Sequence, residues 1–147
     1  MIIPVEALRV WEIEIMGQPA AQARPRFAGG RAYRTGRSVQ WEANAAALMA
    51  ERWEGPPLSC PVSLSVVALF ERPQRMRWKR KPMPRTAHTS RPDLDNVIKS
   101  TGDALELGGV VAADSVISRV VAWKGYAAGN EAPRVSVRLE WGHEVTP

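Results

Sequence analysis

The sequence predicts a single α+β domain, in which two main helices pack on one face of a mixed β-sheet. Four stretches alternate apolar and polar residues, as half-buried strands do. Two other stretches repeat apolar residues at helical spacing. The 147 residues contain no internal repeat and no linker, so we expect residues 1–147 to build one domain around one core.

The first expected strand covers residues 8–16. Its alternation places one apolar face toward the core, consisting of Trp11, Ile13 and Ile15. Gly17 and Pro19 end this strand.

An extended loop and a hairpin follow. Residues 18–26 contain a proline between two arginines, and Gly29-Gly30 predicts a tight β-hairpin over residues 26–33. Five arginines line the hairpin and its exit: Arg24, Arg26, Arg31, Arg34 and Arg37. Two readings are open for them, a phosphate-contacting surface and a solvated hairpin without a partner.

The first helix is expected over residues 38–53, followed by a strand over residues 61–70. The apolar stripe of the helix consists of Trp41, Ala45, Leu48 and Met49. Gly55 and the prolines after it end the helix. The strand alternates Val62, Leu64, Val66 and Ala68.

Residues 72–92 form a basic loop. Between residues 72 and 91 there are eight Lys or Arg residues and no acid, and prolines at 73, 82, 84 and 92 interrupt any periodicity. A loop of this length is uncommon in a compact domain without a functional reason. Trp78 either stacks on an exposed base or packs against the core, and we favour packing. For His88 we favour a structural loop role over a general base.

The second helix is expected over residues 93–107, with Gly108-Gly109 as its stop. Its buried stripe consists of Leu94, Val97, Ile98, Thr101 and Leu105. Residues 110–113 are expected to return along the sheet. Two further strands are expected over residues 116–126 and 133–141, and the tail at 143–147 is expected to fray.

Carboxylates surround this second helix. Asp93 and Asp95 directly follow a proline, and Asp114 stands among apolar residues after the Gly-Gly break. Hard divalent cations prefer oxygen ligands, so these residues suit a metal site. Residues two apart do not share a helix face, so Asp93 and Asp95 converge only if Asp93 lies in the entering loop or at the cap.

Each of these polar residues, taken alone, also has a purely structural explanation. Aspartate is a favoured N-cap and suits the positive end of the helix dipole. Asp95 and Lys99 are four apart, and Asn96, Lys99 and Asp103 lie on neighbouring turns, as on an ordinary solvated face. The combination is what favours a metal site.

The same residues resemble the RusA family of Holliday junction resolvases. The resemblance rests on Asp93-Leu94-Asp95-Asn96, Lys99, Asp103-Ala104-Leu105 and Asp114. It is strongest over residues 91–124 and extends to the GxP and RPR elements at Gly17-Gln18-Pro19 and Arg24-Pro25-Arg26. Members commonly have two adjacent aspartates at the downstream site, whereas Ala113 precedes Asp114 here.

The resemblance implies a small, often prophage-borne endodeoxyribonuclease that cuts four-way junctions with Mg²⁺ or Mn²⁺ in DNA recombination and repair. It implies Asp93, Asp95 and Asp114 as catalytic metal ligands. Protonated Lys99 would contact the phosphate, while Asn96 and Asp103 would orient the ligands from outside. RusA-like proteins are dimers, which suits the two matched nicks that a two-fold symmetric junction requires.

The net charge of +5 and a sequence pI of about 10.0 favour a polyanionic partner. We assign phosphate contacts to basic residues near the acidic cluster and in the N-terminal loop: Arg24, Arg26, Arg75, Arg77, Lys79, Arg80, Lys81 and Arg91. The sequence has neither a secretory signal nor a membrane-spanning apolar run. We therefore expect a cytoplasmic protein that needs no membrane and no small-molecule cofactor.

Two rival functions stay open. One is a metal nuclease with a broader preference for forks, flaps or RNA-containing branches. The other is a protein that binds junctions or branched DNA without cutting, its activity lost with the change that Ala113 represents. Cleavage of four-way, three-way and linear substrates separates the first rival, and metal-dependent turnover separates the second.

Overall fold

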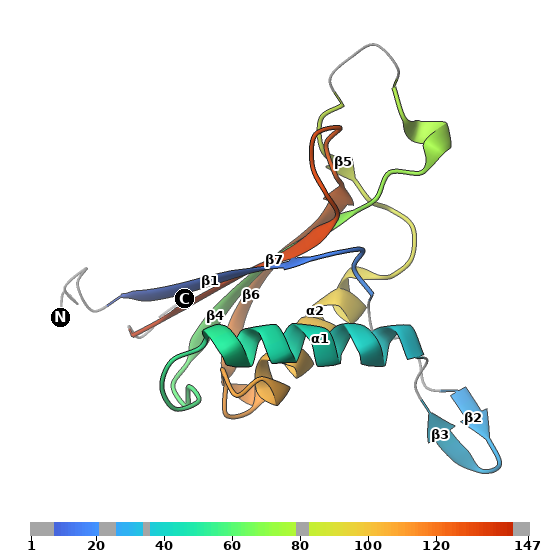
Figure 1. Ribbon diagram of the computed structural model, residues 1–147. Helices are drawn as coiled ribbons and strands as arrows, with labels where there is room; N and C mark the ends of the chain where they lie inside the picture. Colours follow the sequence, from blue (N-terminus) through green and yellow to red (C-terminus); the bar gives the residue numbers. More distant parts are fainter. Residues whose placement is uncertain (1–7, 21–25, 34–35, 79–82, 143–147) are drawn as a thin grey trace.

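Five strands form one sheet in the order β1-β7-β4-β6-β5 (Figure 1). Their bounds are β1 (Arg9–Met16), β4 (Val62–Phe70), β5 (Thr86–Ala87), β6 (Ile117–Tyr126) and β7 (Arg134–Trp141). Strands β4 and β6 run parallel and the other neighbours run antiparallel, so the sheet is mixed, as predicted. The computed structural model describes residues 8–20, 26–33, 36–78 and 83–142.

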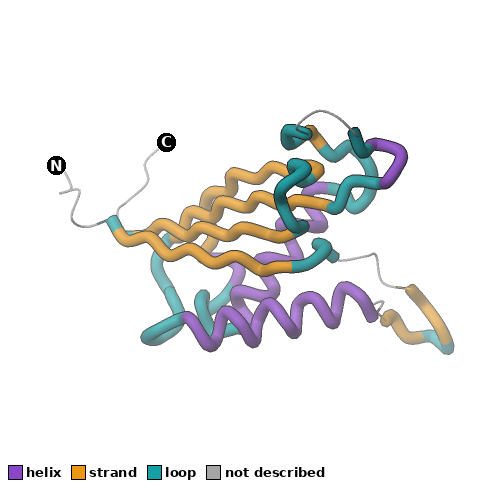
Figure 2. The backbone as a smooth tube through the Cα atoms, turned by 45° about the horizontal axis from the view of Figure 1, so that its top comes forward, coloured by secondary structure: helices purple, strands orange, loops and turns teal. Residues whose placement is uncertain are grey.

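Helices α1 (Gly36–Arg52) and α2 (Leu94–Leu107) cover the same face of the sheet (Figure 2). The core lies between them and the inward residues of the strands. Its most deeply buried members include Met49, Leu64, Leu105, Val137 and Leu139. Alternating apolar residues fill one sheet face and the helical stripes close it, which confirms the predicted α+β domain.

The parallel pair β4–β6 decides where the functional residues lie. Parallel neighbours need a crossover connection, and here it carries the basic loop, β5 and α2. After α2, the chain reaches β6 through a short 3₁₀ turn, η3 (Asp114–Val116). Asp114 therefore lies just before β6, and an added Cβ on Gly102 of α2 would lie 3.9 Å from the Asp114 Cβ.

The expected return of residues 110–113 along the sheet is wrong. Val111 forms only an isolated parallel bridge with Leu58. The Leu58 amide donates to the Val110 carbonyl and the Ala112 amide donates to the Leu58 carbonyl, both at 2.9 Å. This stretch is too short to form a ladder, so a turn rather than a strand brings Asp114 to the site.

The hairpin predicted over residues 26–33 is present. Strands β2 (Arg26–Ala28) and β3 (Arg31–Tyr33) pair antiparallel in a two-stranded sheet of their own. Gly29 and Gly30 have φ of 58° and 76°, the left-handed conformation that a two-residue turn requires. Arg24 lies outside the described residues, as does the tail at 143–147.

The basic loop has more structure than the sequence predicts. It contains a 3₁₀ turn, η2 (Gln74–Met76), and the short edge strand β5. Arg72 is only 6% exposed and donates to the carbonyls of Pro84 and Ala127. One end of the positive run is thus an internal tie between the loop and the end of β6, rather than a free cation.

Glu131 holds the other side of this loop. Its carboxylate accepts two hydrogen bonds from the Arg85 guanidinium, one from Arg134 at 2.7 Å, and one from the Ala128 amide. The Arg85 hydrogen bonds, more than the reverse effect of desolvation, lower the pKa of Glu131 from 4.5 to about 2. The charged form of Glu131 is therefore stabilised in the folded protein.

Glu131→Gln is expected to lower the free energy of unfolding at pH 7 by about 1–2 kcal/mol, since charged hydrogen bonds are lost. Because folding lowers the Glu131 pKa, its contribution is full above pH 4.5 and disappears as the pH falls toward 2. Urea unfolding from pH 7 to pH 2 should show the variant and wild type converging at acid pH. A constant difference across that range would contradict this role of the charge.

Gly108→Ala is expected to destabilise the fold by about 1–3 kcal/mol, because small-to-large changes in packed sites cause strain. An added Cβ would lie 2.9 Å from the Ala46 carbonyl oxygen of α1 and 3.1 Å from the Met49 Cβ. Gly102→Ala is the matched control inside α2, where the nearest atoms are 3.9 Å away. The control should gain about 0.5–1 kcal/mol from helix propensity. Thermal unfolding compares the two, and equal shifts would contradict the packing argument.

No helix in the described parts of the chain is long and apolar enough to cross a membrane.

Candidate active site

Lys99 joins two aspartates on the exposed side of α2. Its Nζ donates to Asp103 Oδ1 and to Asp114 Oδ2, each at 2.9 Å. Asp103 is one turn further along the same helix, whereas Asp114 comes from η3. The Lys99 side chain is 50% exposed and that of Asp114 is 45% exposed, so the pair is open to solvent.

The two carboxylates fix the protonation state of Lys99. The hydrogen bond that Lys99 donates to Asp103, followed by the one that it donates to Asp114, raises the Lys99 pKa above its ordinary value. Lys99 is therefore a cation throughout the neutral pH range. A protonated amine has no lone pair for a metal, so this residue can contact an anion but cannot be a ligand.

Asp93 and Asp95 occupy the start of α2. Asp93 is the N-cap residue, with an extended backbone at φ −69° and ψ 151°, but its side chain makes no capping hydrogen bond. Its carbonyl instead accepts from the amides of Asn96 and Val97. The capping role considered for Asp93 is thus not the role of its carboxylate. Asp95 is exposed in the first turn, where the helix dipole favours negative charge.

A second group of carboxylates lies at the other end of α2. Within the described chain, Asp103, Glu106 and Asp114 offer oxygen atoms that lie within 4.8 Å of one another. Asp93 and Asp95 do not belong to this group, since Asp95 and Asp103 are separated by about 12 Å of helix rise. The structure therefore brings Asp114 together with Lys99 and Asp103, rather than with the first two aspartates.

Glu106 is the member that the sequence reasoning missed. It lies three residues after Asp103, and residues three apart share a helix face, so the signal was present. Lys99 stands four residues from both Asp95 and Asp103, and here its ammonium turns toward Asp103.

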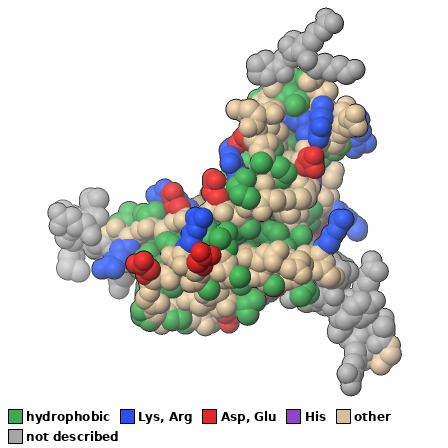
Figure 3. All heavy atoms as spheres, in the orientation of Figure 1, with side chains coloured by type: hydrophobic (Ala, Val, Ile, Leu, Met, Phe, Trp, Pro, Cys, Tyr) green, Lys and Arg blue, Asp and Glu red, His purple; other side chains and the backbone are tan. Residues whose placement is uncertain are grey.

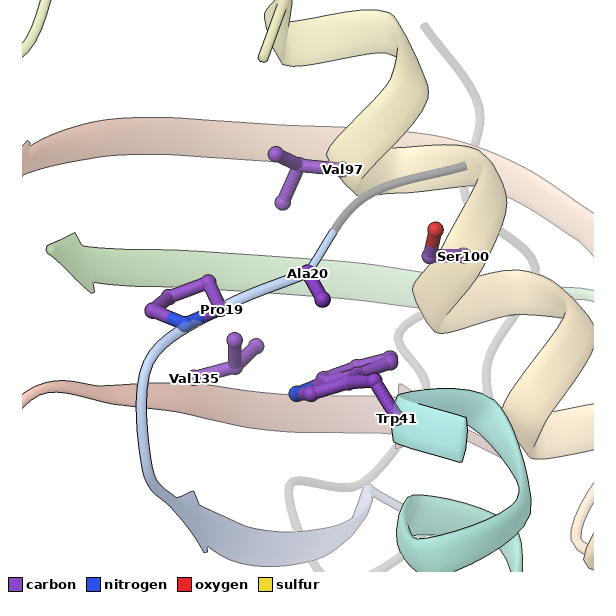
Figure 4. Close-up of a pocket in the computed structure, with 6 residues that line it drawn as sticks. All are labelled: Pro19, Ala20, Trp41, Val97, Ser100 and Val135. Atoms are coloured by element: carbon purple, nitrogen blue, oxygen red, sulfur yellow. The ribbon is translucent and has the colours of Figure 1, made fainter. Parts of the chain in front are cut away.

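The N-terminal loop packs against α2 around a small cavity. Pro19 and Ala20 lie over Val97 and Ser100 of α2, with Trp41 of α1 beneath them (Figure 4). The cavity has a volume of about 10 Å³ and apolar walls, so it holds at most one water molecule. The segment carrying the GxP element therefore packs on the first two turns of the helix that bears the aspartates.

Positive side chains lie on the projection that the basic loop and β5 form (Figure 3). Arg75 and Arg91 are exposed, and Arg77 donates to Glu71 at 3.0 Å. The expected packing of Trp78 against the core is wrong, because Trp78 is 50% exposed. Five of the predicted DNA contacts have side chains that lie outside the described part of the chain: Arg24, Arg26, Lys79, Arg80 and Lys81.

His88 is buried beside the sheet. Its ring stacks on Phe70 at a centroid distance of 4.1 Å and tilts against Tyr126 at 4.7 Å. Burial, and then the nearby Lys124 charge, lower the His88 pKa. A neutral ring in an aromatic stack, 7% exposed, agrees with the structural role that the sequence favoured.

Comparisons with known proteins match nearly the whole chain. The family model described as "Endodeoxyribonuclease RusA" matches residues 16–140. The chain is also similar to a protein named crossover junction endodeoxyribonuclease RusA, from Aquifex aeolicus (strain VF5). The two are 25% identical over 138 residues, which cover 94% of this chain and 96% of the relative.

Proposed function

Because the chain belongs to the RusA family of endodeoxyribonucleases, we propose that it resolves four-way DNA junctions by two symmetric, metal-dependent nicks. It would do so in the cytoplasm, in DNA recombination and repair. The observation that carries the proposal is the open surface on α2 and η3, where the Lys99 ammonium bridges Asp103 and Asp114. Carboxylates to hold a cation and a fixed ammonium to meet a phosphate are the groups that phosphodiester hydrolysis needs.

We assign the metal to Asp93, Asp95 and Asp114. Their carboxylate oxygens fit Mg²⁺, or Mn²⁺ in its place. The carboxylate of Asp93 is not engaged in capping, and that of Asp114 is half-exposed, so both can accept a cation. A bound ion would polarise the scissile phosphate and lower the pKa of a water molecule. Asp114 contacts Lys99 in the structure rather than these two aspartates, so the assignment requires Asp114 to move toward the start of α2 when the ion binds.

Lys99 is proposed to contact the scissile phosphate. Once Asp114 is released, its ammonium can donate to a non-bridging phosphate oxygen and stabilise the charge that develops there. Asp103 keeps the other hydrogen bond and so holds the lysine in place. Asn96 directly follows Asp95 in the first turn, from where its amide can orient a ligand carboxylate.

DNA binding is assigned to the basic residues around this surface. Arg91 is two residues before Asp93, so it can guide the strand to be cut. Arg75 and Arg77 on the projection would hold a junction arm through phosphate contacts, together with Arg24, Arg26, Lys79, Arg80 and Lys81. The exposed Trp78 offers a surface on which a base at the junction centre can stack.

A homodimer completes the proposal. One chain carries one site, whereas a junction with two-fold symmetry needs two nicks at matched positions. A dimer with C2 symmetry supplies both sites in the required relation.

The test is cleavage of a labelled synthetic four-way junction with Mg²⁺ and with EDTA, beside three-way and linear DNA of the same sequence. Paired nicks at symmetric positions on the four-way substrate, lost with EDTA, are the expected result. Equal cutting of all branched substrates would favour the broader nuclease. Tight junction binding without cleavage under any divalent ion would favour the binding protein, with Ala113 as the residue to restore to aspartate.

A further inference from the structure

Lys124 connects β6 to the segment that enters α2. Its Nζ donates to the Ser90 carbonyl at 2.6 Å and to the Pro92 carbonyl at 2.7 Å. These two carbonyls flank Arg91, and the second directly precedes Asp93. One ammonium thus fixes the last peptides before the helix that carries the aspartates.

The main chain of residue 124 holds the same segment from the other side. The His88 amide donates to the Lys124 carbonyl at 3.1 Å, and β5 pairs Ala87 with Gly125. The His88 ring is buried against Phe70. Residues 86–88 are therefore fixed to the sheet, and the Lys124 side chain supplies a second attachment two and four residues after His88.

Within the part of the chain that the structure describes, Lys124 binds two backbone carbonyls and no carboxylate, and we call this pair of contacts the clamp. Its side chain points to the helix-covered face of the sheet, since Lys124 pairs with the inward residue Ala68. Among the ion pairs of the described residues, none includes Lys124. Hydrogen bonds from a charged donor are stronger than neutral ones, and two of them here converge on one short segment.

We propose that Lys124 is a positioning residue for the metal site, holding residues 90–92 so that Asp93 and Asp95 keep their places at the start of α2. This inference rests on the proposed function, in which both aspartates are ligands. Ligands held by a firm outer layer bind metal better than ligands on a loose loop, and losing such support typically costs 10–100-fold.

Three variants test the clamp. Lys124→Met removes the ammonium but keeps the length of the side chain. Lys124→Arg restores a cation with several donors for the two carbonyls. Arg119→Met is the matched control, because it removes one exposed positive charge from the same strand, on the opposite face from Lys124.

Three measurements follow for each variant: Mn²⁺ affinity without DNA, the Mg²⁺ midpoint of junction cleavage, and hydrogen exchange of backbone amides. Lys124→Met should weaken Mn²⁺ binding and raise the Mg²⁺ midpoint, each by roughly tenfold. The amides of Asn96 and Val97, which donate to the Asp93 carbonyl, should exchange faster, while those of β4 stay unchanged. Junction binding in EDTA should stay near wild type, and Lys124→Arg should recover most of each loss.

Wild-type metal affinity and exchange in Lys124→Met would overturn the inference, as would equal losses in Arg119→Met. Faster exchange throughout the sheet would show a role in overall stability and would also overturn it. The proposed function is judged separately, by whether the wild-type protein cuts junctions. If it does not, Mn²⁺ affinity and hydrogen exchange still decide the role of Lys124.

Discussion

Asp95→Asn and Asp114→Asn are each expected to slow junction cleavage by at least roughly 100-fold. A metal ion supplies several kcal/mol of charge stabilisation in the transition state, and each 1.4 kcal/mol is a factor of ten in rate. Asparagine keeps the size of the side chain but loses the charge that holds the cation. Single-turnover cleavage measures the rate. Junction binding in EDTA should be unchanged or slightly tighter, because a negative charge near the DNA has been removed.

Glu106→Gln is the control that separates the proposed set of metal ligands from a rival set. Glu106 groups with Asp103 and Asp114, so it belongs to a rival ligand set at the far end of α2. If Asp93, Asp95 and Asp114 hold the metal, Glu106→Gln should cleave within about threefold of wild type, as expected for a surface change outside the site. An inactive Glu106→Gln beside an active Asp95→Asn would move the metal to the rival set and refute our assignment.

Lys99→Met is expected to lower the cleavage rate by roughly 100-fold, the usual effect of removing one donor to the developing charge. It should also bind Mn²⁺ more tightly. The ammonium lies 2.9 Å from an Asp114 oxygen and competes with the ion for it. Two unit charges 4 Å apart in water interact by about 1 kcal/mol, so the gain should be about fivefold.

If Lys99 and the metal compete for Asp114, Lys99→Met lowers the cleavage rate and raises the affinity for Mn²⁺. Lys99→Arg keeps the charge and should show wild-type Mn²⁺ affinity, with partial activity because the guanidinium has a different shape. Weaker Mn²⁺ binding in Lys99→Met would mean that Lys99 supports the ligands instead of competing for one of them, and the proposed competition would be wrong. Metal titration in the absence of DNA separates the two cases.

The fold was largely predictable because its periodic elements are long. The strands at Val62–Phe70 and Arg134–Trp141 and the helix at Leu94–Leu107 begin and end within one residue of the expected ranges. Their buried faces follow directly from the spacing of the apolar residues. The edge strand Thr86–Ala87 was not predicted, because two residues carry no periodicity and the pairing is decided by the neighbouring β6.

For the candidate site, the sequence offers residue types but not their contacts. Asp93, Asp95, Lys99 and Asp114 are site residues predicted from the sequence, but the contact between Lys99 and Asp114 spans fifteen residues and depends on the turn at η3. Lys124 could not be given a role from sequence, because its acceptors are backbone carbonyls, which every residue has. Local spacing reveals helix faces, whereas contacts between distant segments follow from the crossover.

The place of β7 in the sheet bears on how the protein is made. This last strand of the described chain lies between β1 and β4 and separates the first strand from the rest. While a ribosome is still adding residues 134–141, β1 has no partner in the five-stranded sheet, although α2 and its aspartates have already been synthesised. Contacts so distant in sequence also form slowly. A half-made chain therefore carries the residues of the candidate site before the sheet beneath them is complete.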